Sequence, residues 1–404
     1  MSIFLLVLGI ILFISLVVVH EFGHFIVSRR NGVGVEEFGI FFPPSIYKRK
    51  TKSGWVFSIN SLPLGGFVKL KGEHDSDTEP GTFGAATLWV KSKIMAAGVV
   101  MNLLTALVML TILAAIGIPK IIPNQFTIKS DTKNASQKVL VGSIESGSPA
   151  YKAGLRSQDV ITGIVLAGQK PNVVTNSSNL PNITKKFAGK KVNIYFVRNG
   201  GKQIASTTLL SASTVNASQK TYNKQINQTS LDCATINPPK GYLGISPTDY
   251  TLQKSTWSAP VTAIGLSAQV TALTFQGLGH AIGGLGSLLA GAVTGNSTAR
   301  SNGQCSASSQ VAGPVGIIVI LKDGSQLGYQ FMLFIIAIIS LTLAIMNILP
   351  IPALDGGRLW ITLITRSLNK PLSAKREEII NASGFIFLIG LVILITIVDV
   401  KRFF

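Results

Sequence analysis

The sequence predicts a polytopic α-helical membrane protein with four transmembrane helices, a β-hairpin on the cytoplasmic side and an inserted extracytoplasmic α+β domain. Three observations lead to this fold class. Hydrophobic residues make up 47% of the 404 residues and charged residues only 13%, a balance typical of membrane proteins. Four apolar stretches reach the roughly 20 residues that a helix needs to cross a bilayer. A long polar stretch separates the second of them from the third.

The first apolar stretch is expected to be an uncleaved anchor with its N-terminus outside. It has no basic n-region and no small-residue cleavage site, and Arg29 and Arg30 follow it. Basic residues cluster after the first stretch, before the second, and between the third and fourth, which predicts that these connections face the cytoplasm. The predicted spans are residues 3–27, 94–118, 331–349 and 380–398.

Residues 255–297 complicate this topology because they are rich in Gly and Ala and contain no charged side chain. A fifth crossing here would invert the third span. We therefore interpret 255–329 as interfacial or re-entrant amphipathic helices. The chain then divides into a first membrane half (1–118, with a hairpin at about 53–73), an extracytoplasmic domain (119–254), this interfacial segment, and a second membrane half (330–404).

The first span carries a cluster of ionisable residues in the sequence His20-Glu21-Phe-Gly-His24. Histidines four residues apart share one face of a helix, so both imidazoles can reach one Zn²⁺. Glu21 lies beside them, placed to take a proton from a water that the metal activates. A pair of core histidines is the structural alternative. Inside a bilayer, however, unpaired ionisable groups are costly and mark function.

A catalytic zinc site needs a third protein ligand, and Asp355 is the candidate. It is the only acid between Asp323 and Glu377, and it follows the third span in the sequence Met-Asn-Ile-Leu-Pro-Ile-Pro-Ala-Leu-Asp-Gly-Gly. The predicted topology brings it to the same membrane face as the two histidines. Two prolines break the helix there, and Gly356 and Gly357 are expected to allow close approach of the chain to the metal.

These motifs resemble the site-2 protease family of intramembrane zinc metalloproteases. HExxH ends a first span, and NxxPxPxLDG ends a later one. Residues 63–73 resemble the family's membrane-associated β-hairpin, and 313–317 the lead-in to its third span. Residues 92–102 resemble the start of its second span, although Val99 stands where a proline is usual. The resemblance covers most of the chain, and the bacterial regulator-of-sigma-E branch is the most similar.

The resemblance implies an endopeptidase of the bacterial plasma membrane that cuts transmembrane segments, such as those of an anti-sigma factor or a remnant signal peptide. One Zn²⁺ would be held by His20, His24 and Asp355, Glu21 would be the base, and Asn347 would help to position the substrate. The active site would face the cytoplasmic side. Two β-prone runs around a Pro-Leu-Gly-Gly break suit a hairpin whose edge accepts the substrate as an added strand. The residues predicted for that edge are Gly65, Gly66, Phe67 and Val68.

The extracytoplasmic domain resembles a PDZ domain. A strand, a short helix begun by Pro149 and ended by Gly154, and a second strand make up residues 139–164. Asn199-Gly200-Gly201 predicts a hairpin turn. Gly241, Leu243 and Gly244 belong to a stretch that resembles the PDZ loop receiving a peptide end. The domain either binds a substrate C-terminus or blocks bulky ectodomains.

Other readings remain open. The formal net charge of +19 suggests anionic lipid more than nucleic acid, because no nucleic-acid motif accompanies it. A catalytically silent, membrane-anchored PDZ adaptor with a structural metal site is one alternative, and a transporter is another. A disulfide between Cys233 and Cys305 is permitted outside the cytoplasm and is left undecided. Residues 211–228 are interpreted as a flexible insertion, and His74 as part of a solvated acidic loop.

Overall fold

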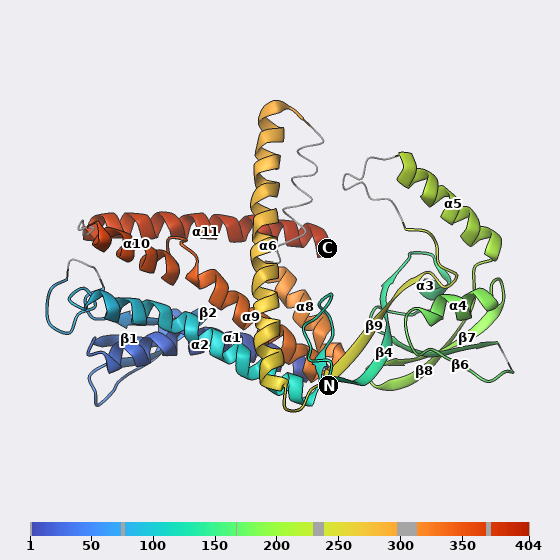
Figure 1. The fold of residues 1–404 in the computed structure, drawn as a ribbon, viewed down its shortest axis with the longest axis horizontal. Helices are drawn as coiled ribbons and strands as arrows, with labels where there is room; N and C mark the ends of the chain where they lie inside the picture. The colour runs from blue at the N-terminus through green and yellow to red at the C-terminus, as the bar shows by residue number, and fades with distance from the viewer. Residues whose placement is uncertain are drawn as a thin grey trace.

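The computed structural model describes residues 2–73, 77–166, 168–228, 238–296, 313–368 and 373–403. Cys233, Cys305 and His74 lie outside these ranges, so the predictions about them are not addressed. Long helices lie beside one another, with the β1–β2 hairpin at one end and a β domain at the other (Figure 1).

Each of the four predicted spans forms a helix of 20 residues or more that is long and apolar enough to cross a membrane. Helix α2 begins six residues earlier than predicted, because the Thr87 hydroxyl accepts a hydrogen bond from the Val90 N–H and caps the first turn. These helices are α1 (Ser2–Arg30), α2 (Leu88–Ile116), α9 (Tyr329–Ile348) and α11 (Ala374–Phe403).

Small residues let α1 approach α2 closely. A Cβ added to Gly23 would lie 2.7 Å from the Ala97 carbonyl oxygen, so only glycine fits at this crossing. On its other side α2 packs against α9 through a buried cluster that includes Leu110, Leu113 and Leu341. Helix α2 therefore contacts both α1, which carries the two histidines, and α9, which precedes the segment that leads to Asp355.

The pairing predicted for the hairpin at 53–73 was wrong. The two runs on either side of the Pro-Leu-Gly-Gly break both belong to β2 (Val56–Leu70), and each pairs antiparallel with β1 (Val35–Lys50), which precedes the predicted range. Residues 37–40 pair with both ends of β2, so β2 bends around this part of β1. Among the described residues, β1 is the only strand paired with the end of β2 at 66–70. The other edge of this strand is therefore open.

The β domain contains a sheet in the order β3-β9-β4-β5-β7-β8, with β6 beside β5. The predicted turn joins β7 to β8, and Asn199 and Gly200 both have positive φ there, as a type I′ turn requires. The interpretation of 211–228 as a flexible insertion was wrong. These residues form helix α5, which their lack of Gly and Pro permits. The elements are β3 (Ile118–Pro119), β4 (Lys133–Ile144), α3 (Pro149–Lys152), β5 (Val160–Leu166), β6 (Asn172–Val173), α4 (Asn179–Lys186), β7 (Lys191–Arg198), β8 (Gly201–Thr208), α5 (Ala212–Gln228) and β9 (Ile245–Lys254).

The predicted interfacial segment holds one continuous helix, α6 (Ala259–Thr294), followed by α8 (Pro314–Leu327). Helix α6 is a fifth helix whose length and composition would suit a membrane span, so the predicted count of four spans stays a prediction. Its first half packs Ala263, Leu266 and Val270 against α2 and α9. Hydroxyl and backbone donors of Ser258 and Thr256 bind the Asp131 carboxylate at the start of α6 and hold the pKa of Asp131 below its usual range.

Candidate active site

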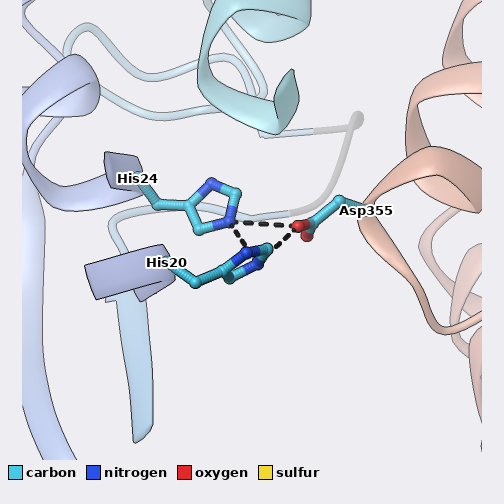
Figure 2. A group of neighbouring side chains, drawn as sticks. All are labelled: His20, His24 and Asp355. Carbon is cyan, nitrogen blue, oxygen red and sulfur yellow. Dashed lines mark hydrogen bonds and ion pairs between the residues drawn. The ribbon is translucent and has the colours of Figure 1, made fainter. Parts of the chain in front are cut away.

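The structure brings His20, His24 and Asp355 together from opposite ends of the sequence. Both histidines extend from α1 toward Asp355, which approaches from the first turn of α10 (Asp355–Ser367) (Figure 2). Nε2 of His20 lies 2.9 Å and Nε2 of His24 3.1 Å from the same Asp355 oxygen, Oδ2. The two Nε2 atoms are 3.2 Å apart. Three potential ligand atoms thus form a nearly equilateral triangle.

This triangle fits a zinc ion. Ligand atoms about 2.0–2.1 Å from a tetrahedral zinc lie about 3.3 Å from one another, close to the three observed separations. The donor set of two imidazoles and one carboxylate leaves a fourth position open, as catalytic zinc sites do. Helix α2 also leaves room for the imidazoles. A Cβ added to Gly98 would lie 2.5 Å from Nε2 of both histidines.

The second nitrogen of each imidazole faces α2. Nδ1 of His24 lies 2.7 Å from the Ile94 carbonyl oxygen and donates to it when protonated. Nδ1 of His20 lies 3.3 Å from the side-chain amide of Asn102. Histidines that bind metals are generally oriented by such a partner on the nitrogen away from the metal. Helix α2 therefore supports the site without supplying a metal ligand.

A turn of irregular backbone delivers Asp355 to this point. Helix α9 stops at Ile348 before the two prolines, and Ala353 adopts a positive φ of 73° just ahead of α10. The expectation that Gly356 and Gly357 allow close approach to the metal stays a prediction, and the structure shows a different constraint on both glycines. A Cβ on Gly356 would lie 2.4 Å from the Leu349 oxygen, and one on Gly357 would lie 2.1 Å from the Ile351 oxygen. The glycines let this loop fold back on its own backbone.

A cavity of about 100 Å³ opens beside the cluster. Glu21, His24 and Asp355 line it together with two further charged side chains, Glu73 after β2 and Arg358 on α10. Arg358 reaches across to the first membrane half, where its Nη2 donates to the Glu73 carbonyl oxygen at 3.2 Å. Apolar side chains complete the wall, namely Val68, Leu70, Phe83, Ile94 and Met95.

The predicted edge strand lies next to Glu21. Val68 and Glu21 line the same cavity, and a Cβ added to Gly66 would lie 3.5 Å from Cγ of Glu21. Gly65, with φ of 148°, would place a Cβ 3.5 Å from Val17 of α1. Phe67 pairs with Gly39 of β1. The open edge of β2 therefore runs past the candidate base.

The other predicted site residues, Asn347 and three residues of the β domain, do not contact the histidines or Asp355 in any hydrogen bond found among the described residues. Asn347 is half-buried in the last turn of α9, on the segment that leads to Asp355. Gly241, Leu243 and Gly244 lie in the β domain, where the Leu243 carbonyl accepts from the Ala150 N–H and Gly244 has φ of 74°. The β1–β2 hairpin and the β domain lie at opposite ends of the molecule (Figure 1).

Sequence reasoning missed Gly98, Asn102 and Arg358. Asn102 did carry a signal, because it is an amide inside an otherwise apolar span, and polar groups at such positions mark function. Gly98 carried none that distinguishes it from an ordinary helix-packing glycine.

Comparison with known proteins agrees with this geometry. The pattern of peptidase family M50 matches residues 8–391. The chain belongs to peptidase family M50, the site-2 protease family. A "putative zinc metalloprotease" of Clostridium perfringens is 27% identical, with 98% of each chain covered. The "probable protease eep" of Enterococcus faecalis is 28% identical, again with 98% of each covered. A "putative zinc metalloprotease" of Clostridium acetobutylicum is 29% identical, covering 99% of this chain and 98% of its own.

As an M50 peptidase the protein is a zinc metalloendopeptidase, and its apolar helices make it a membrane protein. The family supports proteolysis within the membrane. The two imidazoles and the carboxylate agree with that assignment, because their ligand atoms are spaced as a zinc ion requires.

Proposed function

We propose that this M50 peptidase hydrolyses peptide bonds within or near transmembrane segments, with His20, His24 and Asp355 holding one Zn²⁺ and Glu21 acting as the base. The observation that carries the proposal is the triangle of ligand atoms beside a glutamate that binds none of them. By the family's nature the substrates are membrane proteins. An anti-sigma factor and a remnant signal peptide are the two classes we favour.

Each residue has a separate task in the proposed reaction. When bound, zinc supplies Lewis acidity that polarises the scissile carbonyl and makes water a stronger nucleophile. Glu21 takes the proton from the attacking water and returns it to the leaving amine. Glu21 is half-buried, and it lines the same cavity as His24 and Val68. The chain thus holds the proton acceptor next to the point of attack.

The open edge of β2 is the proposed substrate-binding strand, through Gly65, Gly66, Phe67 and Val68. A helical substrate must unwind locally before a peptide bond becomes accessible, and an extended segment can then pair with a free strand edge. Asn347 precedes the loop that carries Asp355, and we propose that it contacts the substrate and helps to position it. This arrangement would present the peptide bond alongside Glu21.

We propose four spans, with the active site toward the cytoplasm of a bacterium and residues 119–254 outside as a PDZ domain. Helix α6 supports this count, because it runs across α2 and α11 in Figure 1. A helix that runs crosswise to the spans would lie along the membrane surface, as we propose for the segment at 255–329. The first membrane half (1–118) and the second (330–404) then enclose the site. The PDZ domain either receives a substrate C-terminus near Gly244 or excludes bulky ectodomains.

Cysteine labelling in intact cells tests this topology. Single cysteines at exposed positions Lys52, Lys202 and Thr294 are introduced after Cys233 and Cys305 are replaced by serine. A membrane-impermeant maleimide is expected to label positions 202 and 294 from outside, and position 52 only after permeabilisation. Protection of position 294 alongside labelling of position 202 would mean that α6 crosses the membrane, and the four-span proposal would fail.

Metal removal tests the proposed function. Purified full-length protein in detergent should cut a panel of reporter transmembrane substrates, lose at least about 100-fold of that rate after treatment with a zinc chelator, and regain it on zinc addition, since metals stabilise the transition state by several kcal/mol. Zinc content is measured on the same samples. Full activity in a preparation verified to be zinc-free would refute the proposal.

A further inference from the structure

We propose that Asn102 is a positioning residue whose side-chain amide keeps His20 in the tautomer that can bind the metal. The inference rests on the proposed function, because it takes His20 as a zinc ligand. It adds a residue of α2 to a site whose ligands come from α1 and α10.

The starting observation is the placement of the two imidazoles between two different sets of partners. Each histidine directs Nε2 toward Asp355 and Nδ1 toward α2. For His24 the partner on α2 is a backbone carbonyl, that of Ile94, at 2.7 Å. For His20 the partner is the Asn102 amide, whose nitrogen lies 3.3 Å from Nδ1. Asn102 is 1% exposed, so no solvent competes for this contact.

The chemistry of imidazole dictates what these partners must do. A neutral imidazole has one N–H and one lone pair, and a metal requires the lone pair. If Nε2 binds zinc, Nδ1 carries the hydrogen and needs an acceptor. The Ile94 carbonyl is such an acceptor for His24. Among the described residues, the side chain that contacts Nδ1 of His20 is that of Asn102, and the oxygen of its amide can serve as the acceptor.

That oxygen is available. Oδ1 of Asn102 is buried and has no hydrogen-bond partner among the described residues. A half-turn of the amide exchanges its oxygen and nitrogen with little change in shape. After this half-turn Oδ1, in place of Nδ2, faces Nδ1 of His20. The flip exchanges which amide atom faces Nδ1, so it is favoured only when metal binding at Nε2 places the hydrogen on Nδ1, because a buried N–H without an acceptor is costly.

An amide suits both states of the site, whereas other side chains suit one or neither. Without metal, the Nε2–H of His20 can donate to Asp355 at 2.9 Å, and Nδ2 of Asn102 donates to Nδ1. With metal, Nδ1–H donates to Oδ1. Asp at this position could serve only the second state. The orientation of the amide is therefore coupled to metal occupancy.

The position of Asn102 is itself held by α9. The Ser340 hydroxyl, which is fully buried, donates to the Asn102 carbonyl oxygen at 2.8 Å. This bond fixes the main chain of α2 against α9 at the level of His20, so that a change of side chain at 102 need not displace the helix. A substitution there can accordingly report on the contact with His20.

The test compares zinc affinity in full-length variants in detergent, by competition with a chromophoric chelator. Asn102→Leu keeps the size of the side chain and removes the acceptor, and it is expected to weaken zinc binding about 10- to 100-fold, as losses of such supporting contacts do. Asn102→Asp keeps an acceptor and is expected to stay within a few-fold of wild type. Thr105→Val is the matched control, because its hydroxyl donates only to the Met101 carbonyl one turn away on the same helix.

A second readout is the visible spectrum of the cobalt-substituted protein, which reports ligand geometry. We expect it to change in Asn102→Leu and not in Thr105→Val. Equal zinc affinities for Asn102→Leu and wild type would overturn the inference, and so would equal losses in the Leu and Asp variants, which would indicate packing rather than an acceptor. His20→Ala separates the two proposals. If it binds zinc as tightly as wild type, the proposed ligand set is wrong, whatever Asn102 does.

Discussion

Replacing Glu21 by glutamine is expected to abolish peptide hydrolysis while zinc stays bound. Glutamine keeps the size of the side chain, but it cannot accept the proton of the attacking water. Loss of a positioned general base lowers rates by roughly 10²–10⁴-fold. The measurement is the initial rate of cleavage of a transmembrane reporter by the full-length variant in detergent, with zinc content determined on the same sample.

His24→Ala is the matched control for this variant, because it removes a proposed ligand one turn along the same helix and should lose both zinc and activity. The two substitutions thereby separate the base from the metal site. A Glu21→Gln protein that cuts at the wild-type rate would show that another group accepts the proton. One that loses zinc would place Glu21 among the ligands instead.

The inactive Glu21→Gln protein also offers a way to locate bound substrate, since the uncut segment should remain at the site. A photo-reactive residue in place of Val68 lies on the open edge of β2 and in the cavity wall. It should cross-link the substrate. The same residue in place of Tyr47, an exposed position on β1, should not. Equal capture at both positions would contradict the proposed strand pairing.

The membrane-embedded part of the fold was predictable because each signal for it is local. A span can be recognised by its length and composition. Inside the bilayer a helix is one of the few structures that satisfy all backbone hydrogen-bonding groups. The turn at Asn199-Gly200 is equally local. Helix α6 was harder, because 36 residues of Gly, Ala and moderate hydropathy fit a surface helix and a span alike. Its direction depends on packing against α2 and α9, which no short pattern encodes.

In the candidate site, too, local patterns were predictable and contacts between helices were not. His20, Glu21 and His24 share one helix face, so their spacing suffices to group them. Asp355 required an argument about topology as well as the absence of competing acids. The contributions of α2 could not be derived, because they depend on how near one helix passes to another. Asn102 becomes meaningful only once it is known to face Nδ1 of His20, and the role of Gly356 only once the loop is seen to fold on itself.

Gly98 gives the sharpest test of that helix approach, and Gly98→Ala is expected to disable the enzyme. The added Cβ would lie 2.5 Å from Nε2 of both histidines, closer than such contacts occur, so the imidazoles themselves must move. Those two atoms are the proposed zinc ligands. A displacement of about 1 Å at a reacting centre costs on the order of 100-fold in rate. We therefore expect at least that loss of activity, together with weaker zinc binding by chelator competition.

Gly390→Ala is the control for Gly98→Ala, because Gly390 also lies in a long apolar helix but a Cβ there would meet no atom within 4 Å among the described residues. In a helix interior alanine is favoured over glycine by roughly 1 kcal/mol, so this control should be as stable as wild type or more so, with unchanged activity. If Gly98→Ala instead kept both zinc affinity and activity, the imidazoles could not lie against α2 as described. The support that α2 gives to His20 and His24 would then have to come from a different face of that helix.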